Sequence, residues 1–129
     1  MLKLLLLLLL VLSLQARHMN KEKVYQEHFC KQFGGVSEYR LKDRTRVDCL
    51  LNDYAIEVDF AKKWAESIGQ SLYYASQTSR KAAVLLIMED LEKDEKYLHR
   101  LKDVSQKHGI EIWVIDKDFK IQKDQAINR

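Results

Sequence analysis

The sequence predicts an α/β domain in which helices pack on the faces of a mixed β-sheet. Segments with apolar residues at helical spacing alternate along the chain with shorter strand-like segments. A continuous apolar run at residues 82–88 is typical of a strand that is covered on both faces. The 129 residues are 47% hydrophobic and 32% charged, with no Pro and only 4 Gly, so the composition argues against collagen-like or low-complexity disorder.

One helix followed by three strands opens the domain. In residues 22–33 the aromatic residues Tyr25, Phe29 and Phe33 recur every four positions. This spacing predicts a short amphipathic helix, and the glycine pair that starts at Gly34 is placed to end it. Strand-like segments follow at residues 36–41, 45–51 and 54–60.

Helices and strands alternate in the second half of the chain. Residues 62–77 predict a helix with a buried stripe, made of Ala61, Ala65, Ile68, Leu72 and Ala75. After the apolar strand at 82–88, a charged helix at 91–108 ends at Gly109. A further buried strand at 110–115 and a short return strand at 119–121 complete the core. The predicted order is α-β-β-β-α-β-α-β.

A leader precedes this domain. Residues 1–16 read MLKLLLLLLLVLSLQA, one Lys, an apolar run and a small residue, which is the pattern of a cleaved signal peptide. The run is shorter than the about 20 apolar residues that cross a bilayer, so no stable membrane span is expected if the leader is cleaved. The domain then covers residues 17–121, with a polar tail at 122–129. A functional leader predicts a secreted or periplasmic protein, a retained one a membrane anchor, and a start at Met19 a cytoplasmic protein.

The chain has two cysteines, Cys30 and Cys49. In an oxidising compartment these two thiols could pair. We favour the alternative that one or both are small apolar core residues. Neither lies in a CxxC or other spacing that indicates structural zinc.

Two acidic residues on a predicted hairpin are the main functional signal. A two-residue turn at Asn52-Asp53 sets a register in which Asp48 lies directly opposite Glu57. Opposed carboxylates, about 5 Å apart at Cβ, repel each other unless something compensates. Together with a backbone carbonyl and waters they form an oxygen-ligand site for Mg²⁺ or Mn²⁺, suited to polarising a phosphate and activating water. Alternatively, both acids are solvated on an exposed sheet face, with Arg46 partly neutralising them.

Alternation along the hairpin supports this register. The apolar face holds Val47, Cys49, Leu51, Tyr54, Ile56 and Val58. The polar face holds Arg46, Asp48, Glu57 and Asp59. The helix that follows carries polar residues on one side, namely Lys63, Gln70, Tyr74 and Gln77.

In these motifs and in the order of its elements, the chain resembles the PD-(D/E)xK, or restriction-endonuclease-like, nuclease superfamily. Asp48 followed by Glu57-Val58-Asp59 matches the D…(D/E)-x-K pattern except at its last residue. The stretch QSLYY at 70–74 is similar to the Q-x-x-x-Y helix motif of the RecB-type branch. The resemblance, which spans residues 22 to about 115, implies a restriction-endonuclease-like fold and a metal-dependent endo- or exonuclease that acts on DNA or, less favoured, RNA.

The resemblance also implies roles for individual residues. Asp48 and Glu57 would bind Mg²⁺ or Mn²⁺, and Gln70 and Tyr74 would lie beside the nucleic-acid backbone or organise the site. Some branches carry a Glu on the first helix, so Glu22 is a possible third acidic contributor, or else an ordinary first-turn Glu favoured by the helix dipole. Dimerisation is common among such nucleases, which makes a homodimer possible.

One position departs from the family. Asp59 stands where the family has the Lys that orients the attacking water, and an Asp cannot supply a positive charge. Some branches move the Lys to the following helix, where Lys63 is a better candidate than Lys62 because it shares the face of Gln70 and Tyr74. Asp59 could instead be a third metal ligand. Equally, the substitution could mark a catalytically inactive module of the same fold that binds nucleic acid or a protein.

Basic residues bracket the predicted site, as nucleic-acid binding requires. They are Lys42, Arg44 and Arg46 near the hairpin, then Lys62, Lys63, Arg80 and Lys81 around the second helix. The formal net charge of the whole chain is only +3. The sequence therefore favours nucleic acid, DNA first, as the partner, bound weakly or with help from a partner or a dimer. A third hypothesis is an unrelated α/β protein whose acidic hairpin is fortuitous.

Overall fold

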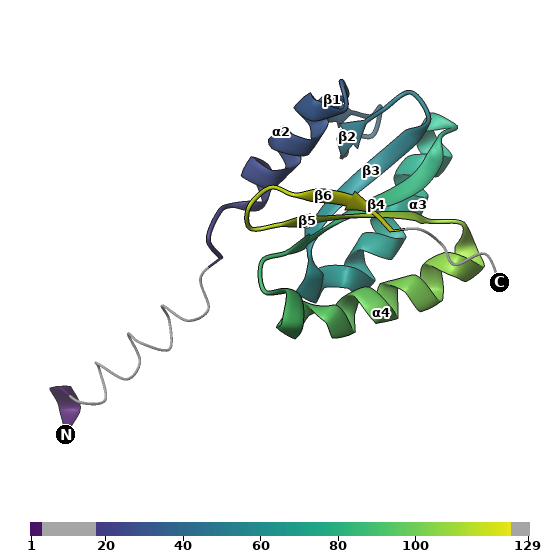
Figure 1. Ribbon diagram of the computed structural model, residues 1–129. Helices are drawn as coiled ribbons and strands as arrows, with labels where there is room; N and C mark the ends of the chain where they lie inside the picture. Colours follow the sequence, from purple (N-terminus) through teal and green to yellow (C-terminus); the bar gives the residue numbers. More distant parts are fainter. Residues whose placement is uncertain (4–17, 125–129) are drawn as a thin grey trace.

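Helices flank both faces of one mixed six-stranded sheet in the computed structural model, which describes residues 1–3 and 18–124 (Figure 1). The predicted α/β class with a mixed sheet is therefore confirmed. Within residues 18–124 the helices are α2 (Glu22–Gln32), α3 (Trp64–Thr78), which a short 3-10 turn η1 (Ala61–Lys63) precedes, and α4 (Leu91–His108). The strands are β1 (Val36–Arg40), β2 (Arg46–Leu50), β3 (Tyr54–Phe60), β4 (Lys81–Met88), β5 (Glu111–Asp116) and β6 (Ile121–Lys123).

The strands lie in the sheet in the order in which they follow along the chain. Antiparallel pairing joins β1 to β2, β2 to β3, and β5 to β6, whereas β3, β4 and β5 are parallel. Each parallel step needs a crossover connection, which α3 and α4 provide. Because β4 is paired on both sides and covered on both faces, its residues after Lys81 are all buried, as the apolar run predicted.

Two hydrophobic clusters lie on opposite faces of the sheet. Tyr25 and Phe29 of α2 pack on the face that includes Ile56 and Val58. The other cluster joins Leu101 of α4 to alternate residues of β4, with side chains of α3 packed against it. Since successive side chains of a strand point to opposite faces, the residues between Ile56, Val58 and Phe60 project toward α3. The two acids of β3 thus lie on the face that α3 covers.

The buried stripe of α3 differs from the prediction. Ser67, Ser71 and Tyr74 are buried, whereas Ala65 and Leu72 are exposed. The two serine hydroxyls can be buried because they donate to backbone carbonyl oxygens within the helix, Ser67 at 2.6 Å and Ser71 at 3.0 Å. Small satisfied hydroxyls let the helix approach a sheet face that carries carboxylates.

Cys30 and Cys49 form a disulfide that ties α2 to β2, with a Cα–Cα distance of 5.7 Å. The preference for unpaired core cysteines is therefore wrong, although both residues are buried. Both thiols belong to the cluster beneath α2, so the packing that buries them also brings them together. The same contact leaves no room for a side chain at Gly35, because a Cβ there would lie 2.7 Å from Cys49 Sγ and 2.6 Å from Leu51 Cδ2.

The chain ends differ in part from the predicted boundaries. The return strand is Ile121–Lys123 rather than 119–121, so it extends into the predicted tail. Phe119 lies outside the strand because its backbone is left-handed, with φ 62°. Its ring packs on Tyr25, with 5.2 Å between the ring centroids. The predicted leader, apart from residues 1–3, and residues 125–129 of the tail lie outside the described residues. In the described ranges no helix has the length and apolar character needed to cross a membrane.

Candidate active site

The hairpin of β2 and β3 has the predicted register. Cys49 pairs with Ile56 and Leu50 with Ala55, and the amide of Leu51 donates to the carbonyl oxygen of Tyr54 at 2.9 Å. The paired ladder ends there, and counting on by one residue sets Asp48 opposite Glu57. The two-residue turn chemistry therefore brings the two acids together as the sequence indicated. The predicted apolar face is wrong at Val47, which packs with Ala55 and Tyr74 and not in the cluster of Cys49, Ile56 and Val58.

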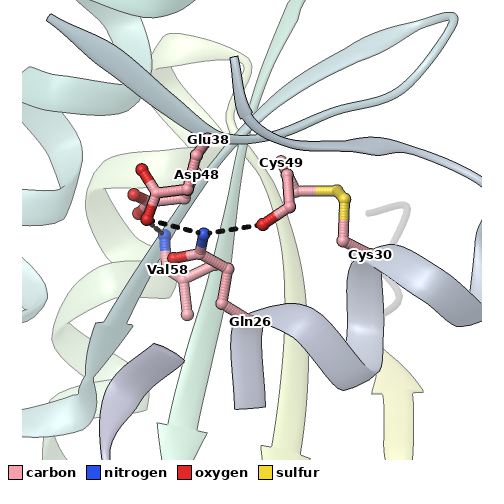
Figure 2. Close-up of a disulfide and its surroundings, with 7 residues drawn as sticks. Gln26, Cys30, Glu38, Asp48, Cys49 and Val58 are labelled. Atoms are coloured by element: carbon pink, nitrogen blue, oxygen red, sulfur yellow. Dashed lines mark hydrogen bonds between the residues drawn. A yellow bond between two sulfur atoms is a disulfide. The ribbon is translucent and has the colours of Figure 1, made fainter. Parts of the chain in front are cut away.

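At Asp48 the regular ladder between β2 and β3 gives way to a side-chain contact. The amide of Val58 donates to Asp48 Oδ2 at 2.7 Å instead of to a backbone oxygen of β2 (Figure 2). On the other side of β2, the register of β1 leaves Glu38 opposite Asp48, and Glu38 has a left-handed backbone with φ 55°. Figure 2 shows the Glu38 and Asp48 carboxyl groups close together, with the Gln26 side chain between them and the disulfide. Both strands are thus distorted where the acids gather.

The acids of β3 are buried rather than solvated. Glu57 and Asp59 are each 5% exposed, and Asp48 is partly buried. Glu57 Oε2 and Asp59 Oδ2 are inaccessible to water and have no hydrogen-bond partner among the described residues. The alternative of an exposed acidic sheet face is therefore wrong, because α3 covers this face. A buried carboxylate oxygen without a donor is costly unless a proton or a cation neutralises it.

Burial and mutual repulsion favour protonation of all three acids. Burial raises the pKa of Glu57 well above its usual range, and the charges of Asp48 and Asp59 raise it further. Burial also raises the pKa of Asp48, although the Val58 amide partly offsets this. For Asp59, burial raises the pKa first and the charge of Glu22 second. The three groups lie close enough to influence one another, so they titrate together rather than independently.

Two flanking charges complete the cluster. Glu22 of α2 is close enough for its charge to raise the pKa of both Asp48 and Asp59. Lys63 of η1 acts in the opposite direction and lowers the pKa of both Asp59 and Glu22. The structure thus brings Lys63 beside the acids, and Glu22 faces the cluster in addition to lying in the first turn of its helix.

The other predicted site residues divide into two groups. Tyr74 is 8% exposed beside the acids, and burial followed by the charges of Glu57 and Asp48 raises its pKa to about 12. Gln70 is exposed and makes no hydrogen bond to the acids among the described residues. Lys62 lines a separate cavity of about 530 Å³ that includes His18. Arg46 is exposed at the start of β2. Sequence reasoning grouped all of these, but only Tyr74 joins the acids.

Two residues near the acids escaped sequence reasoning, Gln26 and Glu38. Gln26 is 2% exposed, and its amide donates to Ser37 Oγ at 3.1 Å and to Glu38 Oε1 at 3.3 Å. Gln26 lies four residues after Glu22, on the same face of α2, and next to the buried Tyr25. A polar residue on an inward helix face was the available signal. Nothing in the sequence of β1 marks Glu38, since its position depends on the distortion of the strand.

The donor chemistry of this cluster fits a hard divalent cation. Within residues 1–3 and 18–124 no set of three or more His, Cys, Asp or Glu side chains is arranged as a preformed metal centre. Mg²⁺ needs fewer protein ligands, because it keeps several waters and is usually held by one or two carboxylates together with substrate phosphates. Asp48 and Glu57 are such a pair, and the unpartnered oxygen of Glu57 calls for a positive charge.

Comparison with known proteins finds a distant relative. No protein-family model and no solved structure matches this chain. A KilA-N domain-containing protein of Acanthamoeba polyphaga mimivirus is 30% identical over 96 residues, which are 74% of this chain and 37% of the relative. The chain therefore spans little more than a third of the length of that protein, and this similarity alone does not assign a family.

Proposed function

We propose that this domain is a metal-dependent nuclease of the restriction-endonuclease-like class that hydrolyses phosphodiester bonds in DNA. One observation carries the proposal. Asp48, Glu57 and Asp59 converge beneath α3 with raised pKa values, and two of them have a buried oxygen without a donor. A structural role would not require three acids at one buried place, whereas a cation-dependent hydrolase does. The relative with a KilA-N domain favours nucleic acid as the partner.

Each residue then has a chemical task. Asp48 and Glu57 hold Mg²⁺ or Mn²⁺, and the Val58 amide fixes the orientation of the Asp48 carboxylate. The bound cation supplies charge stabilisation for the phosphate and lowers the pKa of a water molecule. Asp59 is the third acid and either completes the ligand set or orients water.

Lys63 replaces the family lysine in this scheme. It comes from η1, directly after the strand that ends at Phe60, and its charge acts on Asp59. A cation at this point can stabilise the negative charge that develops on a phosphate, as the lysine of the family pattern does. Because Lys63 can supply this positive charge from η1, the presence of Asp59 in place of the family lysine need not abolish cleavage.

An inactive module of the same fold is the second candidate. Asp59 at the position of the motif lysine favours it, as do the exposed Gln70 that does not contact the acids and the lack of a preformed three-ligand centre among the described residues. Such a module would bind nucleic acid or a protein partner without hydrolysis.

Cleavage assays separate the two candidates. Plasmid and single-stranded DNA are incubated with the full chain and Mg²⁺ or Mn²⁺, beside the isosteric variants Asp48→Asn and Glu57→Gln. Asp103→Asn on the exposed surface of α4 serves as the matched control. We expect cleavage by the wild type and the control, and a loss of about a hundredfold or more in the two site variants. Lys63→Ala is expected to lower the rate as well. If the wild type cleaves neither substrate with either metal, the nuclease proposal is wrong and the inactive module is the favoured candidate.

A further inference from the structure

A basic groove lies between the β1–β2 loop and the C-terminal end of α3. It has a volume of about 400 Å³, and Tyr39, Arg40, Lys42, Gln77 and Arg80 are among its lining residues. No carboxylate is among the residues that line it in the described part of the chain. The lining of the groove therefore combines three cations with one aromatic ring and one amide.

The cations of this region repel one another. Arg40 and Arg46 are direct cross-strand partners in the pairing of β1 with β2, and like charges in that position are destabilising. Neither arginine, nor Lys42, takes part in an ion pair among the described residues. Arg80 is held at the other wall, where its Nε donates to the carbonyl oxygen of Asn52 at 3.1 Å. This arrangement calls for an anionic partner.

Side-chain contacts fix the groove next to the acids. Asp43, in the β1–β2 loop, accepts hydrogen bonds from Thr45 within the loop and from Tyr73 of α3. The loop is therefore fastened to the helix, and the one acid of the loop is occupied. Tyr74 lies one turn before Gln77 on α3 and is buried beside Glu57. One side of α3 therefore extends from the acids, beside Tyr74, to the groove, which Gln77 lines.

We propose that this groove binds single-stranded nucleic acid and leads it to the acidic cluster. Arg40, Lys42 and Arg80 contact the phosphates, and the ring of Tyr39, which is 41% exposed, stacks on a base. A basic groove combined with an exposed aromatic ring is typical of single-strand binding, because bases in a duplex cannot stack on a protein ring. The choice of nucleic acid rests on the proposed function, while the binding itself does not require cleavage.

The test measures binding in EDTA, where metal-dependent cleavage does not occur. Fluorescence anisotropy of labelled oligothymidine, oligouridine and a DNA duplex is recorded with the full chain over a range of salt concentrations. The groove variant Arg40→Gln/Lys42→Gln is compared with the charge-matched control Lys31→Gln/Lys117→Gln, which removes two exposed cations that do not line the groove. A second variant, Tyr39→Leu, removes the ring and keeps the apolar bulk. Circular dichroism verifies that each variant is folded.

We expect the salt dependence of single-strand binding to become shallower in the groove variant. The magnitude of the slope of log Kobs against log salt should fall by about 1.4, since two phosphate contacts are lost and each contributes about 0.7. The control should keep the wild-type slope. Tyr39→Leu should weaken binding to oligothymidine or oligouridine by about tenfold and leave duplex binding unchanged. The two oligomers together show whether DNA or RNA is preferred.

Several results would overturn the inference. Folded groove variants that bind single strands like the wild type would refute it, as would equal binding of polyglutamate through the same residues. If the groove variants bind single strands normally and the wild type cleaves DNA, the groove proposal is wrong and the nuclease proposal stands. If binding depends on the groove residues but the wild type does not cleave DNA, the groove proposal stands and the nuclease proposal is wrong.

Discussion

Replacing Glu57 by Gln should stabilise the folded protein in metal-free buffer. Glu57 is buried against Asp48 and Asp59, and its raised pKa means that folding takes up a proton at neutral pH. The ordinary pKa of this carboxyl is 4.5. Each pH unit between that value and the working pH costs about 1.4 kcal/mol as long as the folded group stays protonated. At pH 7 the cost approaches about 3 kcal/mol, and a neutral amide of the same shape avoids it.

The sign of the pH dependence follows from the same shift. A group with a raised folded pKa binds more protons in the folded state, so the wild type loses stability as pH rises above about 4.5 until the folded pKa is reached. The gain from Glu57→Gln should therefore be small near pH 4 and reach about 2 to 3 kcal/mol at pH 7. Urea denaturation of both proteins at several pH values measures this difference in the free energy of unfolding.

The control is Glu95→Gln, which changes an exposed glutamate of α4. Its effect should stay within about 0.5 kcal/mol at every pH. Mg²⁺ or Mn²⁺ should stabilise the wild type more than Glu57→Gln, because the cation replaces the proton that the carboxylate would otherwise hold. A loss of stability in Glu57→Gln at pH 7, or a difference that does not change with pH, would refute the reasoning.

Three further changes test the fold around the site. Reduction of the Cys30–Cys49 disulfide, which spans 19 residues, should lower the free energy of unfolding by about 3 kcal/mol, measured in urea with and without dithiothreitol. Gly35→Ala should cost about 1 to 3 kcal/mol because its Cβ meets the disulfide and Leu51, whereas Gly69→Ala, with open space on α3, should raise the melting temperature. Arg40→Gln should add about 0.5 kcal/mol by relieving the repulsion across β1 and β2; a lower melting temperature would contradict this.

The part of the site that depends on local chemistry could be predicted from the sequence. The two-residue turn sets the pairing of β2 with β3, and the opposition of Asp48 and Glu57 follows from counting along that register. Lys63 was preferred to Lys62 because it shares a helix face with Gln70 and Tyr74, and of these two residues Tyr74 is buried beside the acids whereas Gln70 is exposed. Short-range geometry carries such information because few residues separate the partners.

The part that depends on long-range packing could not. Burial of the acids requires α3 to lie over them on Ser67 and Ser71, which a count of apolar residues does not favour as a buried face. Gln26 reaches Glu38 only because α2 packs beside β1, and the disulfide depends on the same contact. Phe119 has a left-handed backbone, so the return strand begins two residues later than its sequence predicts.

Charge imbalance links the acids to the basic groove. Two buried acids and the partly buried Asp48 have Lys63 as a nearby cation, whereas Arg40, Lys42 and Arg46 on the β1–β2 side form no ion pair among the described residues. A divalent cation at the acids and a phosphodiester along the groove would neutralise both, and each would strengthen the binding of the other, since phosphate oxygens complete the coordination of Mg²⁺. The arrangement of charge therefore favours a function in which metal and nucleic acid bind together.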